Sequence, residues 1–234
     1  MPSGVSRQIR SIRRLLSKRF GRLEVRPEKD AVGELVKTIL SQNTSDVTSL
    51  RAFDNLKKGF KDWDSLRKSG ATSIKKRIKS AGLSNIKAPR IKGALNEIVR
   101  RRGALDLGFL GGLDTGSGYR FLRSIKGIGP KTAAIVLLFS FGKPIMPVDT
   151  HILRVMKRLG LIGPKTTREK AQDFLTEKSP KHAIKEFHLH LILHGREICT
   201  ARAPKCLLCN LRLLCKYYGD RYGGNNAKDR KKRV

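Results

Sequence analysis

The sequence predicts an all-α protein, and three observations support that fold class. Apolar residues recur at i, i+3, i+4 and i+7 in most segments, which is the period of one face of a helix. No segment alternates apolar and polar residues as a half-buried strand does. The segment 131–141, KTAAIVLLFSF, is apolar on nearly every side, which is typical of a helix at the centre of a domain.

The first half of the chain is expected to form five helices joined by short connections. Each begins near a capping residue or a proline, both of which favour a helix start. They cover 5–20, 27–40, 45–60, 72–81 and the segment that begins at Pro89. Gly82 follows the fourth helix, and glycine is the usual residue just beyond a helix end.

The second half is predicted to be helical as well. Residues 103–120 are rich in glycine and lack a period, so we expect a loop there, with at most a short helix. A short helix over 121–125 and a turn precede the apolar helix 131–141. Later helices are expected to begin at Thr150, at Thr167 and at Pro180, the last capped by Ser179. The basic segment 223–234 is expected to be a disordered tail.

The net charge of the chain limits the kind of molecule that it is expected to bind. The chain has 51 Lys and Arg against 19 Asp and Glu, a net charge of +32. A polyanion is the expected partner, and nucleic acid comes before a ribosomal or membrane surface, because each cation placed on a phosphate releases a counterion. No run approaches the roughly 18 apolar residues of a membrane span, and the N-terminus lacks the apolar core of a secretory signal.

We therefore expect no membrane association and a cytoplasmic, nucleoid-associated protein. The scarcity of glutamine and the abundance of charged residues favour a thermophilic source.

The four cysteines fall within 17 residues, in the spacing C-x6-C-x2-C-x5-C: Cys199, Cys206, Cys209 and Cys215. Disulfides are disfavoured in a reducing cytosol. A structural zinc site usually has two close pairs separated by a longer stretch, whereas here one compact loop holds all four thiols. The spacing therefore favours a [4Fe–4S] cluster, with zinc as the alternative. Arg202 and Lys205 in this loop would contact DNA phosphates or act as ordinary surface charges.

The segment 125–133 is typical of a helix-hairpin-helix. A short helix ends in the turn Lys126-Gly127-Ile128-Gly129, and the apolar helix follows. The glycines allow backbone N–H groups to approach a phosphate, and the second helix directs its positive N-terminal end toward the same anion. Such backbone contacts carry no sequence information, so they suit a protein that scans duplex DNA.

Lys131 and Asp149 are the candidate catalytic residues. Lys131 lies just inside the second helix, and the neutral amine of a lysine there can act as a nucleophile and form a Schiff base. The simpler interpretation is a lysine that contacts phosphate. Asp149 precedes a predicted helix, so it is expected to be an N-cap, a role that is compatible with catalysis. His151 is expected to be structural.

Three segments together, GIGPKTA, VDTHILRV and LILHGREIC with the cysteine spacing, resemble the endonuclease III family of DNA glycosylases. The resemblance extends over about residues 30–216. It implies two helical domains that flank a DNA-binding cleft. A six-helix domain with the hairpin would span 28–143, an iron–sulfur domain would combine 1–27 with 144–222, and a basic tail would follow over 223–234.

The resemblance also implies an activity. The family includes bifunctional glycosylases and AP lyases that remove oxidised pyrimidines from double-stranded DNA, and a monomer is expected. Lys131 would attack the sugar C1′ of a flipped nucleotide, with Asp149 assisting, and β-elimination would cleave 3′ to the abasic site. Leu83, with either Gln42 or Asn43, would fill the space that the flipped nucleotide leaves.

Two alternatives remain at the level of sequence. One is a mismatch glycosylase of the same superfamily that removes thymine or adenine, although such relatives usually carry another residue at the position of Lys131. The other is a non-catalytic DNA-binding module with an iron–sulfur or zinc site, which would bind DNA without cleaving it.

Overall fold

The computed structural model describes residues 4–23 and 28–223, and every regular element in that part of the chain is a helix. The all-α prediction is confirmed. Within the described residues, no helix is both long enough and apolar enough to cross a membrane. Apart from Gly223, the predicted tail lies outside the described residues. The chain divides into two compact units, Arg26–Lys143, here called the hairpin unit, and Met1–Val25 with Pro144–Val234, here called the cysteine unit.

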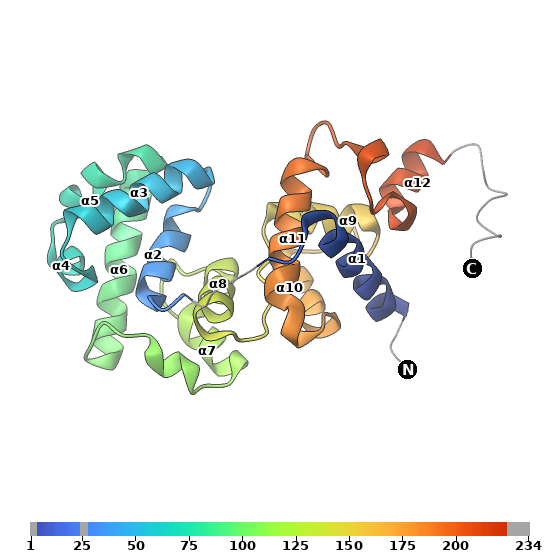
Figure 1. The fold of residues 1–234 in the computed structure, drawn as a ribbon. Coiled ribbons are helices and arrows are strands. Elements are labelled where there is room, and N and C mark those ends of the chain that lie inside the picture. The colour runs from blue at the N-terminus through green and yellow to red at the C-terminus, as the bar shows by residue number, and fades with distance from the viewer. Residues whose placement is uncertain (1–3, 24–27, 224–234) are drawn as a thin grey trace. The chain divides into compact units, whose positions relative to one another are not determined.

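The hairpin unit contains seven α-helices and two 3₁₀ turns in its described residues, shown in Figure 1 from light blue to yellow-green. They are α2 (Ala31–Leu40), α3 (Asp46–Gly59), α4 (Trp63–Lys68), α5 (Ala71–Arg77), η1 (Lys79–Ala81), α6 (Ser84–Arg102), η2 (Gly108–Gly111), α7 (Thr115–Arg123) and α8 (Pro130–Phe141).

Helix α8 is the centre of the hairpin unit. Its residues from Thr132 to Leu138 are buried except Ile135, as its apolar sequence predicts. Helices α2 and α7 both pack against it. Gly118 of α7 permits a close approach, because a Cβ at that position would lie only 3.0 Å from Leu137 Cδ2.

The cysteine unit combines the first helix with the C-terminal part of the chain. Its elements are α1 (Gly4–Phe20), α9 (Thr150–Leu159), α10 (Arg168–Lys178), η3 (Lys181–Ala183), α11 (Ile184–Glu197), η4 (Cys206–Leu208), η5 (Arg212–Leu214) and α12 (Lys216–Tyr222). Helix α11 packs against both α9 and α1. Ile9, Ile12 and Leu16 form the buried stripe of α1, so this helix is part of the core of the unit.

Three sequence-based boundaries are wrong. The glycine-rich segment 103–120 is not mainly a loop, because α7 already begins at Thr115 and uses Gly118 for close helix packing. Helix α6 begins at Ser84 rather than Pro89, and the proline lies inside the helix on its exposed side. The fourth helix ends at Arg77, and the separate 3₁₀ turn η1 completes the segment.

Ser179 also differs from its predicted role. It is the C-cap of α10, whereas Pro180 opens η3 and α11 begins only at Ile184. The helix that begins at Thr150 does have Asp149 as its N-cap, as expected. Two short helices, α4 and α12, were not expected, because six or seven residues are too few to show a helical period.

Asp30 joins two parts of the hairpin unit. One carboxylate oxygen accepts a hydrogen bond from the Gly33 N–H at 2.7 Å and caps α2, while the other accepts one from Trp63 Nε1 at 2.8 Å. Helix α2 is thereby fixed both to its own first turn and to α4.

We expect Asp30→Ala to lower the free energy of unfolding by about 2 kcal/mol, because it removes a helix cap and leaves a part-buried indole N–H unpaired. Asp30→Asn retains a capping oxygen and should cost about half as much. Chemical denaturation of both variants measures the difference. Equal stability of the alanine variant and the wild type would contradict this role for Asp30.

Candidate functional site

The turn between α7 and α8 leaves two backbone donors available. The Ile128 N–H donates to the Ile125 carbonyl at 3.1 Å, and the Ile128 side chain is only 3% exposed, so Ile128 closes the turn from inside. Gly127 has a φ of +91°, and in the described chain neither its N–H nor that of Gly129 has a protein partner. An anion would therefore meet these two N–H groups and the exposed Lys126.

Lys131 is the second residue of α8 and is half-buried. The next residue, Thr132, is buried and accepts a hydrogen bond from Gln42 Nε2 at 3.2 Å through its hydroxyl. Arg90 in turn donates to Gln42 Oε1, the oxygen of the side-chain amide. The Arg90 stem also lies against Gly127, where a Cβ would come within 2.6 Å of Arg90 Cγ. Arg90 and Gln42 thus brace the start of α8, and sequence analysis did not identify Arg90.

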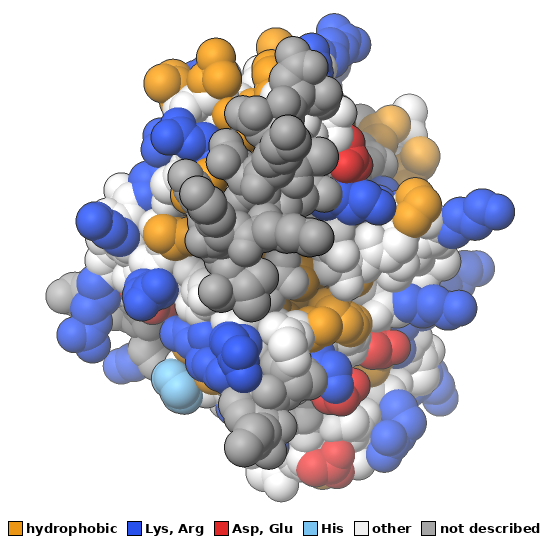
Figure 2. Space-filling model, turned by 90° about the vertical axis from the view of Figure 1, so that its right-hand side faces the viewer, with side chains coloured by type: hydrophobic (Ala, Val, Ile, Leu, Met, Phe, Trp, Pro, Cys, Tyr) orange, Lys and Arg blue, Asp and Glu red, His pale blue; other side chains and the backbone are white. Residues whose placement is uncertain are grey.

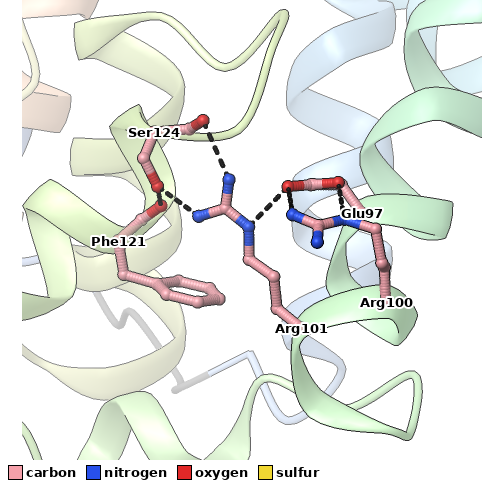
Figure 3. A network of polar contacts seen from close by, with 5 residues as sticks. All are labelled: Glu97, Arg100, Arg101, Phe121 and Ser124. Carbon is pink, nitrogen blue, oxygen red and sulfur yellow. Dashed lines mark hydrogen bonds and ion pairs between the residues drawn. The ribbon is translucent and has the colours of Figure 1, made fainter.

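A second brace lies at the other end of α6 (Figure 3). Arg101 donates to the Ser124 hydroxyl at 2.6 Å and to the Ser124 carbonyl at 3.3 Å, and it also pairs with Glu97. Arg100 and Arg101 together hold the pKa of Glu97 at about 2. Ser124 immediately follows α7, so this network fixes the point from which the hairpin turn departs.

Two neighbouring turns of the hairpin unit present residues in left-handed backbone conformation. Asn43 has a φ of +53° and is exposed, and Leu83 has a φ of +51° and is 50% exposed. For residues other than glycine, this conformation costs roughly 1–3 kcal/mol and indicates a backbone that its surroundings hold in place. Gln42, by contrast, is occupied by Thr132 and Arg90.

Lys87 of α6 is the most buried cation near these turns, with 1% of its surface exposed. Its ammonium donates to the Leu40 carbonyl at 2.6 Å, to the Ala81 carbonyl at 2.9 Å and to the Thr44 hydroxyl. Burial lowers the pKa of Lys87 below its ordinary value. Sequence analysis missed this residue, although it extends the buried stripe Ile91, Leu95 and Ile98 backward by one turn.

Asp149 lies in the cysteine unit and is 9% exposed. Its carboxylate accepts a hydrogen bond from the Ile152 N–H at 2.8 Å, which caps α9 and fixes the side chain. The preceding segment is held by Thr176, which accepts from the Met146 N–H at 2.9 Å, and by His188 Nδ1, 3.0 Å from the Pro147 carbonyl. Lys131 belongs to the hairpin unit and Asp149 to the cysteine unit.

The four cysteines line one cavity of about 370 Å³, a volume that includes its open mouth. The cavity wall contains no carboxylate, and sulfur is the only anionic donor type that it offers. In the described residues, no three Cys, His, Asp or Glu side chains converge as a site for a single metal ion requires. Burial raises the pKa of the Cys209 thiol to about 11 and also raises that of Cys215. Burial likewise lowers the pKa of His194, on the same wall, to about 4.

Arg158 of α9 holds the start of the cysteine loop. It donates to the Thr200 carbonyl at 2.7 Å and to the Ala201 carbonyl at 2.9 Å, and it approaches Cys199 Sγ at 3.3 Å. Its guanidinium also stacks over the Tyr217 ring, 4.8 Å from the centroid. These contacts of Arg158 fix the backbone of the cysteine loop next to Cys199.

Helix α1 supports the same loop from another side. Asn210 Nδ2 donates to the Leu15 carbonyl at 2.6 Å, and Arg19 donates to the Leu208 carbonyl at 3.2 Å. Arg202 and Lys205 are both exposed on the loop. Figure 2 shows one face of the molecule, on which Lys and Arg side chains are widely spread and acidic side chains are few.

Comparisons with known proteins agree with this arrangement. The family model for the HhH-GPD superfamily of base excision DNA repair proteins matches residues 36–181. The chain is 36% identical over 194 residues to the Endonuclease III of Sulfolobus acidocaldarius, and the match covers 82% of this chain and 84% of that protein. It is 37% identical over 173 residues to an Arabidopsis thaliana protein named as a DNA glycosylase. That match covers 74% of this chain and 59% of the plant protein.

A solved structure supports the same relationship. It is described as a trapped Endonuclease III–DNA covalent intermediate, and it matches with a TM-score of 0.80 at 25% identity. The match covers 94% of this chain and 99% of that chain. The resemblance that the sequence motifs indicated is confirmed, and the chain belongs to the endonuclease III family of the HhH-GPD superfamily of base excision DNA repair proteins.

Proposed function

We propose that this chain is a bifunctional DNA glycosylase and AP lyase that removes oxidised pyrimidines from double-stranded DNA. Membership in the family makes it a base excision repair DNA glycosylase. The observation that carries the finer proposal is the placement of Lys131 in the first turn of α8, beside the two unpaired glycine N–H groups of the hairpin. A similar solved structure is a covalent protein–DNA intermediate, which supports a nucleophilic residue in this fold.

The chemistry follows from a lysine amine and a carboxylate. With the damaged nucleotide flipped out of the stack, the Lys131 amine attacks the sugar C1′, and the bond from C1′ to the base breaks. Asp149 takes a proton from the amine and stabilises positive charge on the sugar. The C1′–O4′ bond of the sugar then opens, O4′ takes up a proton, and C1′ and the Lys131 nitrogen form a Schiff base. The Schiff base acidifies the C2′ proton, whose removal expels the 3′ phosphate by β-elimination. Lys131 is then released by hydrolysis of the Schiff base.

The hairpin would position the duplex without reading its sequence. The N–H groups of Gly127 and Gly129 would bind a backbone phosphate, with Lys126 adding a positive charge beside them. Leu83 and Asn43 would fill the space left by the flipped nucleotide, because both side chains are exposed on left-handed turns. The internal hydrogen bonds of Gln42 favour Asn43 over Gln42 for this role.

The cysteine cavity fits a [4Fe–4S] cluster better than a zinc ion. All four sulfur donors come from one compact loop and line one cavity, whereas a structural zinc site usually has two close pairs separated by a longer stretch. Cys199, Cys206, Cys209 and Cys215 would hold the cluster, which would cross-link the loop and take no part in base removal. Arg202 and Lys205 would then be presented to DNA phosphates by a rigid loop.

The proposal also covers the oligomeric state of the protein, its substrates and its location in the cell. We propose a monomer that acts on duplexes with damaged bases or abasic sites, in the cytoplasm beside the nucleoid. The net charge of +32 supports a nucleic-acid partner.

Lys131→Ala should abolish covalent trapping on DNA and lower strand cleavage by about 10³-fold or more, with binding changed only a few-fold, because it removes the nucleophile. Borohydride trapping on duplexes that carry thymine glycol or an abasic site measures the adduct. Lys126→Ala is the matched control: it removes a neighbouring cation and should keep trapping. Strong trapping by Lys131→Ala would assign the nucleophile to another amine.

Trapping by the wild type at the abasic site alone would keep the lyase and exclude thymine glycol as a substrate. Tight binding without any wild-type adduct would favour a monofunctional glycosylase or a binding module over this proposal.

Asp149→Asn should slow single-turnover base release by about 10²-fold and leave the dissociation constant nearly unchanged. Asparagine can still accept the Ile152 hydrogen bond, so the cap of α9 is retained and the change is confined to the carboxylate. Unchanged turnover in this variant would reduce Asp149 to a helix cap.

Protein purified under anaerobic conditions should be yellow-brown and contain about four irons per chain, as a four-thiolate cluster implies. Metal analysis and the visible absorption spectrum measure this directly. Replacement of Cys209 by serine should remove most of the iron and the colour. Stoichiometric zinc without iron in anaerobic preparations would overturn the cluster assignment.

A further inference from the structure

Asn43 and Leu83 are 40 positions apart in the sequence, but they share a rare backbone property. They are the only residues other than glycine with a positive φ in the described chain. Both side chains are solvent-exposed at the tips of their turns. Asparagine adopts the left-handed region more readily than other residues, whereas an exposed leucine gains nothing from burial that would offset it, so the turn at Leu83 must be held by its surroundings.

Lys87 provides that support for both turns at once. Its ammonium binds the Leu40 carbonyl, three residues before Asn43, and the Ala81 carbonyl, two residues before Leu83. The Thr44 hydroxyl connects the two sides, because it accepts from Lys87 and lies 2.6 Å from the Ala81 carbonyl. Both turns are therefore hydrogen-bonded to one nitrogen atom.

All the hydrogen-bond donors of the Lys87 ammonium are used. An ammonium group has three donors, and here each donor has one acceptor. Within the described chain, Lys87 forms no ion pair, and its acceptors are two carbonyls and a hydroxyl. Burying a lysine without a carboxylate partner is costly, and the hydrogen bonds to these three acceptors offset that cost. Its contacts specify the distance between the two turns.

We propose that Lys87 is a positioning residue, which sets the spacing and height of Asn43 and Leu83 so that both side chains enter the space vacated by a flipped nucleotide. The inference rests on the proposed function. Loss of the ammonium would leave the Leu40 and Ala81 carbonyls unpaired beneath the turns, and the two tips would move independently.

The test is a mutant cycle on base release. Lys87→Met keeps the apolar stem and removes the ammonium. Under single-turnover conditions with a thymine glycol duplex, it should slow base release by about 30-fold. Cleavage at a preformed abasic site should fall by less than about 3-fold, because an abasic sugar has no base to unstack. In an Asn43→Ala/Leu83→Ala background, Lys87→Met should slow base release by less than about 3-fold further.

The same helix offers a matched control. Lys92 of α6 also donates to a backbone carbonyl, that of Ser69, but away from the two turns. Lys92→Met should leave base release within about 2-fold of the wild type. An equal loss from Lys87→Met in both backgrounds would overturn the proposal and make Lys87 a residue of general stability.

Retained abasic-site cleavage shows that the Lys87 variant is folded and that the Lys131 chemistry is intact. Absence of trapping in the wild type would instead refute the proposed function, so the two failures are distinguishable. If Lys87→Met does not fold, the same mutant cycle is measured with Thr44→Val in its place. This variant removes the hydroxyl that links the two turns and keeps the lysine. Additive losses for Thr44→Val would overturn the proposal in the same way.

Discussion

Helix α8 is buried along most of its length, yet the glycine N–H groups before its first turn have to stay free for the proposed phosphate contact. Ala133 to Leu138 are almost all buried, and α2 and α7 pack on them. The turn that precedes the helix must therefore leave the core abruptly, and Gly127, at a φ of +91°, makes this possible. Ile128 closes the turn with its buried side chain and leaves its glycine neighbours with unpaired N–H groups. The positions of Lys131, the proposed nucleophile, and of the two N–H groups proposed to bind a phosphate follow from this one constraint.

Other residues of the hairpin unit hold in place the segments that surround the first turn of α8. Arg90, Gln42 and Thr132 form a chain of contacts on one side. On another side, Arg101 and Ser124 fix the end of α7. Because flipping a nucleotide requires side chains to replace it in the stack, rigid turns avoid an additional cost of ordering upon binding. The buried ammonium of Lys87 holds the turns of Asn43 and Leu83 in the same way and also lowers the cost of ordering them.

Sequence alone predicted the fold class and the elements with a long apolar period, such as α1, α2 and α8. It also identified the cysteine loop and the hairpin, since both depend on local spacing. The start of α7 was misplaced, at residue 121 instead of Thr115, because Gly118 serves close packing and not a turn, and a single sequence does not distinguish these uses. The start of α6 was misplaced because Pro89 is tolerated inside the helix.

The braces of the site could not be predicted for a different reason. Lys87 binds carbonyl groups of residues up to 47 positions away, and Arg90 binds Gln42 over 48 positions. Their partners are backbone carbonyls, a threonine hydroxyl and a glutamine amide, and no local sequence pattern indicates these pairings. Only the place of Lys87 on the buried stripe of α6 hinted at its burial, and no pattern indicated which groups it would contact.

The most direct test of the catalytic account is to map the covalent adduct. Wild-type protein trapped on a thymine glycol duplex with borohydride is digested with trypsin and nuclease, and the modified peptide is sequenced by mass spectrometry. The account predicts that the modification lies on Lys131 and that trypsin fails to cleave after it. An adduct on Lys126, Lys87 or the N-terminal amine would contradict the assignment of Lys131 as the nucleophile.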